Sequence, residues 1–191
     1  MKISHLLFLP ALVAFMGCTT VSSISKPGFE MGRCKRIAVA GFHYTSPTPR
    51  TDVGDFMALG LVKRGYVVVD SSSLSPVISQ DELYESGLTP EIKGKLKALG
   101  VDALVMGTVV DESCSMAGGG EAVLAPYRKS RCTSTVLVKM IEPSTGELLW
   151  GATATETREA VGMTEDRISM MAVESIDTVI PELCLEPQCK K

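Results

Sequence analysis

Three short apolar runs, separated by segments of helix length, constrain the fold of this 191-residue chain most strongly. The runs occupy residues 36–42, 66–70 and 102–110. Runs of this kind fill the strands of a sheet that is buried on both faces. Because helix-forming segments lie between them, the chain is predicted to begin with parallel βα units.

The segments between the runs carry helix start and stop signals. Thr51 can cap a first helix, and Gly65 is its expected end. Residues 71–73 can cap a second, short helix, and Thr89 followed by Pro90 marks the start of a third. The first helix is expected to bury one apolar face, made of Val53, Phe56, Met57, Gly60 and Leu61.

The second half of the chain changes to consecutive strands. Residues 133–141 and 148–158 are predicted strands, and the tight turn at 143–147 makes them antiparallel. An amphipathic helix is expected from Thr164, ending at Pro181. The predicted fold class is therefore α/β, with a mixed sheet in which parallel βα units are followed by an antiparallel hairpin and a C-terminal helix.

The N-terminus has a short, positively charged start followed by an apolar run at residues 6–16. A helix of that length measures about 16 Å, which is about half of the ~30 Å hydrocarbon core of a membrane. The run is therefore predicted to be part of a secretory signal peptide and not a membrane-spanning anchor.

The end of this signal, Phe15-Met16-Gly17-Cys18, resembles the lipobox of bacterial lipoproteins. The resemblance implies cleavage between Gly17 and Cys18, a diacylglyceryl thioether on Cys18, and acyl chains such as palmitate that attach the chain to a membrane. Because Thr19 follows, the resemblance implies the periplasmic face of the outer membrane in preference to the inner membrane. The alternative is an ordinary signal peptide with an incidental cysteine.

Three segments follow from this interpretation. Residues 1–17 are the expected lipoprotein signal peptide. Residues 18–33, rich in Ser, Thr, Pro and Gly, are expected to be the lipidated cysteine and a flexible tether. Extended, such a tether reaches roughly 50 Å. Residues 34–191 are the expected folded domain.

The other cysteines are compatible with export, which permits disulfides. Cys114 and Cys132 bracket one predicted loop and can pair across it, and Cys184 and Cys189 can close a short C-terminal loop. Cys34 is then left free or paired with another chain. The last two cysteines are spaced too widely for a zinc site, so no metal is expected.

Few residues favour catalysis. The chain has two histidines, and because His5 lies in the predicted signal peptide, only His43 is available. His43 follows the first strand, where α/β folds place ligands, but a lone histidine there is more often structural. The acid clusters at 81–85 and 111–112 are expected to be a solvated helix face and a strand end. No catalytic residue and no cofactor are therefore predicted.

Composition also argues against nucleic acid as a partner. The formal net charge is −3 and aromatic residues make up 5% of the chain. A nucleic-acid-binding surface needs a positive patch or aromatic side chains on which bases stack. The predicted partners are a membrane, through the lipid on Cys18, and envelope proteins or further copies of this chain.

Four blocks resemble, in this order, blocks of the CsgG family of bacterial envelope lipoproteins. Similar blocks occur in LpoB-type activators of peptidoglycan synthases and in flagellar outer-membrane lipoproteins. The blocks are residues 36–42, 61–69, 100–107 and 141–150, and the resemblance covers roughly residues 36 to 180. It implies the same α/β fold for residues 34–191.

CsgG itself is an oligomeric secretion pore whose subunits each contribute two β-hairpins to a barrel. A membrane-spanning hairpin needs roughly twenty-two residues including its turn. Residues 113–133 are long enough, but the glycine triplet at 118–120 and the basic residues at 128–131 interrupt apolar alternation, and residues 151–162 are too few for a second hairpin.

The first hypothesis is therefore a non-enzymatic, membrane-anchored lipoprotein that faces the periplasm and binds partners in cell-envelope assembly. Its candidate contacts are the loop at 113–131 and the edge of the strand at 148–158. The alternatives are a subunit of an oligomeric CsgG-like secretion channel, an LpoB-like activator of a peptidoglycan synthase, and an enzyme that uses His43.

Overall fold

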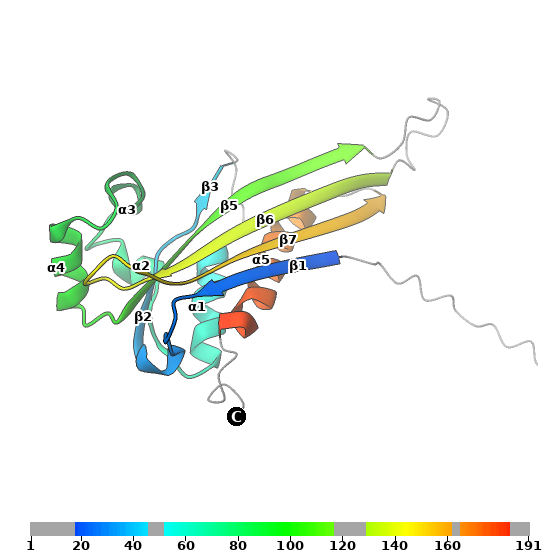
Figure 1. Ribbon diagram of the computed structural model, residues 1–191. Coiled ribbons are helices and arrows are strands. Elements are labelled where there is room, and N and C mark those ends of the chain that lie inside the picture. Colours follow the sequence, from blue (N-terminus) through cyan, green and yellow to red (C-terminus); the bar gives the residue numbers. More distant parts are fainter. Residues whose placement is uncertain (1–17, 46–51, 117–128, 162–164, 184–191) are drawn as a thin grey trace, which may run out of the picture.

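In the computed structural model, which describes residues 18–45, 52–116, 129–161 and 165–183, helices pack on both faces of one mixed sheet (Figure 1). The strands are β1 (Cys18–Ser25), β2 (Arg36–Val39), β3 (His43–Tyr44), β4 (Val67–Val69), β5 (Ala103–Met116), β6 (Lys129–Ile141) and β7 (Leu148–Val161). The helices are η1 (Met31–Arg33), α1 (Val53–Lys63), α2 (Ser71–Leu74), α3 (Gln80–Ser86), α4 (Pro90–Ala98) and α5 (Glu165–Leu183).

The sheet has the strand order β1-β7-β6-β5-β2-β4, and β3 pairs with β5. Strand β2 lies parallel to both β4 and β5, whereas β5, β6, β7 and β1 are successively antiparallel. The predicted fold class is therefore confirmed: parallel βα units come first, the antiparallel hairpin follows, and α5 closes the described chain.

Helix boundaries follow the local chemistry of the sequence. The Thr89 side chain accepts a hydrogen bond from the backbone N–H of Ile92, and Pro90 opens α4, as predicted. Asp52 caps α1 by accepting from Gly54 N–H at 2.8 Å, in the role expected of Thr51. Helix α5 continues through Pro181 to Leu183, because a proline near the end of a helix removes few hydrogen bonds.

Strands β5 and β6 are longer than the sequence indicates. Residues 111–116 continue β5 and pair with residues 130–135 of β6, so the acids at 111–112 do not end the strand. Cys114 and Cys132 occupy opposite positions in this ladder and form a disulfide. Cross-strand pairing outweighs the low β-propensity of this segment. Residues 117–128, the remainder of the expected loop, lie outside the described residues.

The expected tether is corrected at its start. Residues 18–25 form β1, which pairs with β7 through the whole register from Cys18 opposite Thr157 to Ser25 opposite Trp150. Threonine, valine and isoleucine favour extended backbone, and the otherwise free edge of β7 supplies hydrogen-bond partners. The part of residues 18–33 that was expected to be free therefore includes a strand of the sheet.

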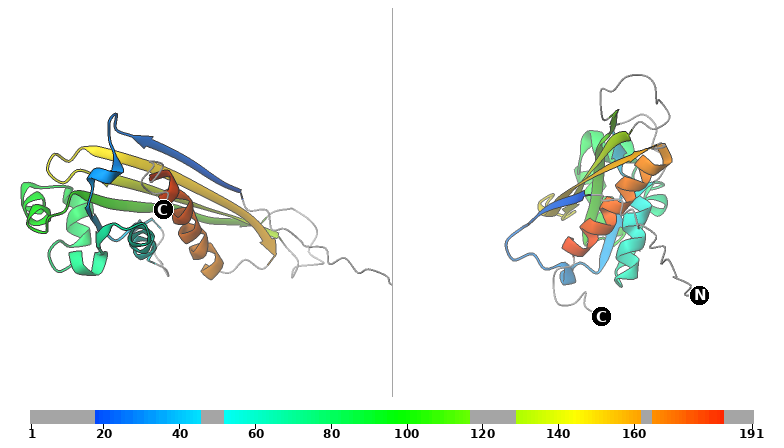
Figure 2. Two further views of the ribbon diagram at one scale, coloured as in Figure 1. Left: turned by 90° about the horizontal axis from the view of Figure 1, so that it is seen from below. Right: turned by 90° about the vertical axis from the view of Figure 1, so that its right-hand side faces the viewer.

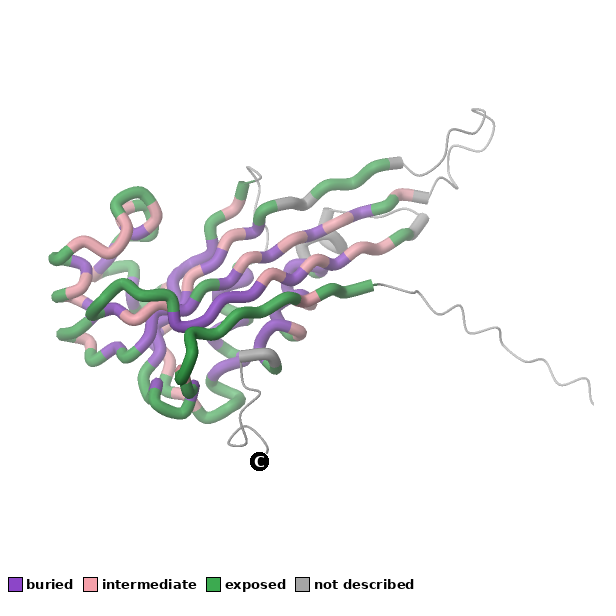
Figure 3. Tube along the Cα trace, viewed as in Figure 1, coloured by how far each residue is buried: buried purple, intermediate pink, exposed green. Residues whose placement is uncertain are grey.

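Two apolar clusters lie on opposite faces of the sheet (Figures 2 and 3). On one face, α1 and α5 cover the sheet, with Ile37, Val105 and Ile176 fully buried. On the other face, α2, α3 and α4 cover only the parallel end, around Ala38 and Leu104. The antiparallel extension is therefore covered by helices on one face only.

The uncovered face of this extension is rich in threonine. The hydroxyls of Thr133 and Thr157 lie 3.4 Å apart, and those of Thr135 and Thr155 lie 3.2 Å apart. Threonine suits a strand face that is half exposed, because its hydroxyl can bond across strands while its methyl group packs.

Helix α1 buries a narrower face than predicted. Val53, Met57 and Leu61 are fully buried, but Phe56 is 38% exposed. The helix packs against α5 as well as the sheet, so its buried stripe is set by two partners whose positions the helical period alone does not define.

Candidate functional site

The predicted lipidation site, Cys18, is an exposed free cysteine at the first position of β1. It lies opposite Thr157 near the end of β7, at the extremity of the sheet where β5 ends and β6 begins (Figure 1). An exposed thiol at the start of an edge strand is sterically open to modification. Gly17, the other half of the predicted cleavage site, lies outside the described residues.

Strand β1 is held at both ends and in its middle. Val21 packs against the main apolar cluster, the backbone N–H of Lys26 donates to Leu149 O at 2.8 Å, and the Lys26 ammonium pairs with Glu147. These contacts fix the position of Cys18 relative to the sheet. Sequence reasoning missed them, because they join segments more than 100 residues apart in the chain.

The free edge of the sheet differs from the predicted one. Strand β7 was the expected docking edge, but β1 and β6 pair with its two sides. Among the described strands, β1 pairs with β7 alone, so residues 18–25 form the edge of the sheet on the β7 side; β4 is the edge strand on the other side. This edge contains no charged residue and no proline, which are the usual protections of an edge strand against pairing with another chain.

The other predicted cysteine pair cannot be assessed, since Cys184 and Cys189 lie outside the described residues. Cys34 is a buried free thiol, and burial raises its pKa to about 11. A thiol with that pKa is almost entirely protonated at neutral pH and is therefore a poor nucleophile.

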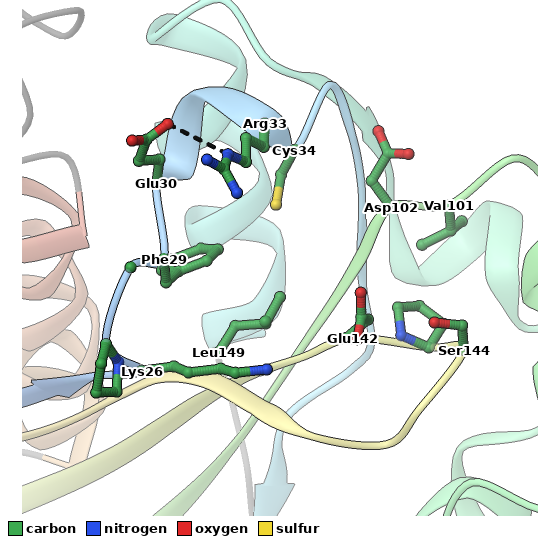
Figure 4. Close-up of a pocket in the computed structure, with 13 residues that line it drawn as sticks. Lys26, Phe29, Glu30, Arg33, Cys34, Val101, Asp102, Glu142, Ser144 and Leu149 are labelled. Carbon is green, nitrogen blue, oxygen red and sulfur yellow. Dashed lines mark hydrogen bonds and ion pairs between the residues drawn. The ribbon is translucent and has the colours of Figure 1, made fainter.

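Cys34 lies in a cavity of about 560 Å³ between η1, the start of β5 and the β6–β7 turn (Figure 4). The charged side chains of this cavity have partners within the protein. Arg33 pairs with Glu30 at 3.2 Å, and the Asp102 carboxylate accepts hydrogen bonds from the backbone N–H groups of Lys35 and Arg36 at 2.8 and 2.9 Å. The charged side chains of Arg33, Glu30 and Asp102 are therefore engaged in contacts that stabilise the fold around the cavity.

His43 lies in β3 and is exposed, with its ring centroid 5.5 Å from that of Tyr84. Within the described part of the chain, no hydrogen bond joins the His43 side chain to a hydroxyl, thiol or carboxylate. The neighbouring Tyr84 hydroxyl bonds to backbone atoms of Gly41 and Gly107 and is used to join α3 to the sheet. Among the described residues, none therefore completes a triad with His43.

An ion cluster with one buried member, Glu156, joins β7 to α5. Glu156 is 2% exposed, and Arg158 donates to its carboxylate at 2.6 Å and also pairs with Glu174 of α5. Burial raises the pKa of Glu156; the nearby Arg158 opposes this effect and Glu174 reinforces it. One oxygen of Glu156 has no hydrogen-bond partner among the described residues, nor has the hydroxyl of Ser134 beside it. In the sequence, this cluster is indicated only by the position of Glu156, an acid at a strand position that alternation places on the buried face.

Glu156→Gln is expected to stabilise the protein at neutral pH, with an advantage that shrinks as the pH falls toward about 4. Because the native pKa of Glu156 is raised, the native state binds its proton more tightly than the unfolded state does. Stability is therefore lost as the pH rises from the unfolded pKa of about 4.3 through the native pKa. Glutamine has nearly the same shape and carries no charge.

Urea unfolding of both proteins across this pH range measures the effect. Glu159→Gln is the matched control on the same strand, because Glu159 is 53% exposed and its side chain lies 3.9 Å from Arg131. A difference in unfolding free energy between Glu156→Gln and wild type that is independent of pH would contradict the assigned cause.

The described residues contain neither a membrane-spanning helix nor a metal-binding cluster. None of the helices there combines the length and apolar character needed to cross a membrane. Nor do three or more His, Cys, Asp or Glu side chains in those segments gather closely enough to hold a metal ion.

Comparison with known proteins identifies a family and a fold. Residues 35–174 match the family described as curli production assembly/transport component CsgG. No curated protein sequence is significantly similar to the chain.

Solved structures of PelC share this fold at low sequence identity. A PelC variant from Paraburkholderia phytofirmans, crystallised as a dodecamer, has a TM-score of 0.53 at 17% identity and covers 87% of this chain and 98% of its own. PelC in a second crystal form gives 0.52 at 17% identity, with 87% and 97% covered. Lipoprotein GNA1162 from Neisseria meningitidis gives 0.46 at 16% identity, with 79% and 99% covered.

Proposed function

Because the chain belongs to the CsgG family, we propose that it is a lipid-anchored protein of the bacterial cell envelope that supports envelope assembly by binding other proteins and not by catalysis. The proposal places it at the periplasmic face of the outer membrane. It has two parts, a permanent anchor at Cys18 and a protein-binding surface on the sheet.

The position of Cys18 is the observation that supports a lipid anchor. The cysteine that ends the lipobox-like segment is exposed at the first position of a strand, with the folded domain directly behind it. Each acyl methylene buried in a membrane contributes about 0.8 kcal/mol, and more than one acyl chain makes attachment effectively permanent. Anchoring confines the domain to the membrane surface and raises its effective concentration for partners there.

The observation that carries protein binding is the free edge of β1. No described strand pairs with this side of β1, so it can accept a strand from another chain, and no charge or proline on the edge opposes this.

A second candidate function is a subunit of an oligomeric secretion channel. The description of the family as an assembly/transport component favours it, as does the dodecameric state of PelC, whose fold this chain shares. Activation of a peptidoglycan synthase, as in LpoB-type proteins, is a form of the first proposal in which the partner is that enzyme.

Native isolation of the acylated full-length protein from crosslinked membranes separates these functions. The binding proposal predicts crosslinks to envelope proteins or between copies. It also predicts loss of these crosslinks when Ser25→Pro removes a backbone N–H that faces away from β7. Thr153→Ala, on the half-exposed face of β7 opposite Ser22, is the matched control and should keep them.

Light scattering and bilayer conductance complete the test. A ring-shaped oligomer that conducts ions would support the channel and contradict the adaptor. A monomer that crosslinks to no envelope protein would contradict both.

A further inference from the structure

One row of residues crosses the antiparallel end of the sheet and includes the predicted anchor. Cys18 lies opposite Thr157, Thr157 opposite Thr133, and Thr133 opposite Ser113. Neighbouring strands are about 4.8 Å apart, so the row extends about 14 Å from Cys18. Residues that are up to 139 positions away in sequence are therefore close neighbours of the anchor.

The residues at and beyond this row lie at one end of the sheet. We define the membrane-facing end as residues 113–115, 130–133 and 157–159, together with Cys18. Arg131 and Glu159 are 60% and 53% exposed in it and lie 3.9 Å apart. None of the large exposed apolar side chains of the described residues belongs to this end. Apart from Cys18 and the Cys114–Cys132 disulfide, the side chains of this end carry hydroxyl groups and charges, which suit polar lipid headgroups and not the hydrocarbon interior.

No flexible linker separates Cys18 from the folded domain, because Cys18 is itself a paired residue of β1. Because β1 is paired along its whole length and Lys26 is bonded to Leu149 and Glu147, an acyl chain on Cys18 is attached to the sheet itself. A domain on a free tether samples all orientations, whereas a domain anchored through a paired strand samples few.

Helices α2, α3 and α4 limit how the sheet can be oriented relative to the membrane. Cys18 shares its face of the sheet with Thr133, and alternation along β6 and β5 places Leu104 on that same face. Leu104 packs under α2, α3 and α4, which project from this face at the far end of the sheet. The sheet therefore cannot lie flat on a membrane, because these helices hold the far end away from it.

We propose that, given the acylation of Cys18 proposed above, paired β1 directs the membrane-facing end against phospholipid headgroups and holds the parallel end with α2–α4 away from the membrane. The guanidinium of Arg131 is then placed to bond lipid phosphates. The 113–131 region, expected from the sequence to bind proteins, contributes residues 113–115, 130 and 131 to a lipid contact.

Fluorescence quenching by headgroup nitroxide lipids tests this orientation. The acylated protein is reconstituted into vesicles of phosphatidylethanolamine and phosphatidylglycerol that contain such a lipid. Tryptophan is introduced at one end of β7 by Glu159→Trp and at the other by Leu148→Trp; both positions are exposed. The two sites are about 36 Å apart along the strand. The buried Trp150, present in both variants, sets the baseline measured in wild type.

The added fluorescence of Glu159→Trp is expected to be mostly quenched, and that of Leu148→Trp to be unchanged. Ser22→Pro removes a β1 backbone N–H that faces β7, at the position opposite Thr153, and so breaks the pairing there. It should remove most of the quenching from Glu159→Trp while the protein stays on the vesicles. Equal quenching at both ends, or none at either, in a protein that floats with the vesicles would overturn this orientation alone. A protein that does not float would overturn the acylation proposal and, with it, the orientation.

Discussion

Gly107→Val is expected to lower the free energy of unfolding by about 3 kcal/mol or more. A Cβ atom at Gly107 would lie 2.1 Å from the ring of Phe42. That ring is 2% exposed and belongs to the main apolar cluster, so it has no space into which it can turn. The side chain of valine needs still more room than one Cβ atom.

The same position also holds α3 to the sheet. The backbone N–H of Gly107 donates to the Tyr84 hydroxyl at 3.1 Å, and Gly107 O lies 2.6 Å from that hydroxyl. A shift of β5 away from Phe42 would break both contacts. The clash therefore cannot be relieved without a second loss.

Urea unfolding followed by circular dichroism measures the change. Gly94→Ala is the matched control, because Gly94 lies in α4 with no heavy atom within 4 Å of an added Cβ. That control is expected to stabilise the protein by about 0.5–1 kcal/mol, as alanine does for glycine within a helix. Equal stability of Gly107→Val and wild type would contradict the packing described for β5.

Cys18→Ser is expected to move the protein from the membrane fraction to the soluble fraction. Without the thiol no thioether forms, and the acyl chains that would hold the domain on the membrane are absent. Because Cys18 is exposed, serine should leave β1 paired and the thermal stability unchanged. The fractionation therefore reports on the anchor and not on folding.

Thr20→Ala is the matched control for this experiment. Thr20 is also exposed in β1, opposite Thr155, and lacks any role in acylation. This variant should stay in the membrane fraction. If Cys18→Ser stays in the membrane fraction as well, some other part of the chain holds the protein on the membrane, and the anchor proposal is wrong.

Local patterns in the sequence predict most of the elements. The cap at Thr89, the stop at Gly65 and the apolar runs of β2, β4 and β5 depend on residues close together in the chain, so they can be interpreted without the rest of the fold. The same is true of the lipobox-like segment, which identifies Cys18 as the candidate anchor from four consecutive residues.

The features that were missed all depend on distant pairing. Cys18–Ser25 has the composition of a linker and becomes β1 because β7 offers it an edge. Residues 111–116 have low strand propensity, yet they are held in β5 by β6 and by the Cys114–Cys132 disulfide. Glu156 is buried because α5 crosses its strand and brings Glu174 to Arg158.

This difference changes the candidate site. A free tether would make the orientation of the domain irrelevant and leave β7 as the docking edge. With β1 paired to β7, the proposed anchor residue, Cys18, is part of the sheet, and the edge on the β7 side is residues 18–25. Under the orientation proposed above, one end of the sheet then faces the membrane.

The central claim is that Cys18 is the acylated first residue of the mature protein, and mass spectrometry of the N-terminal peptide of the protein purified from membranes tests it most directly. The account predicts a peptide that begins at Cys18 and carries the added mass of a diacylglyceryl group and a further acyl chain. An N-terminal peptide with an unmodified Cys18, or one that begins at another residue, would contradict the account.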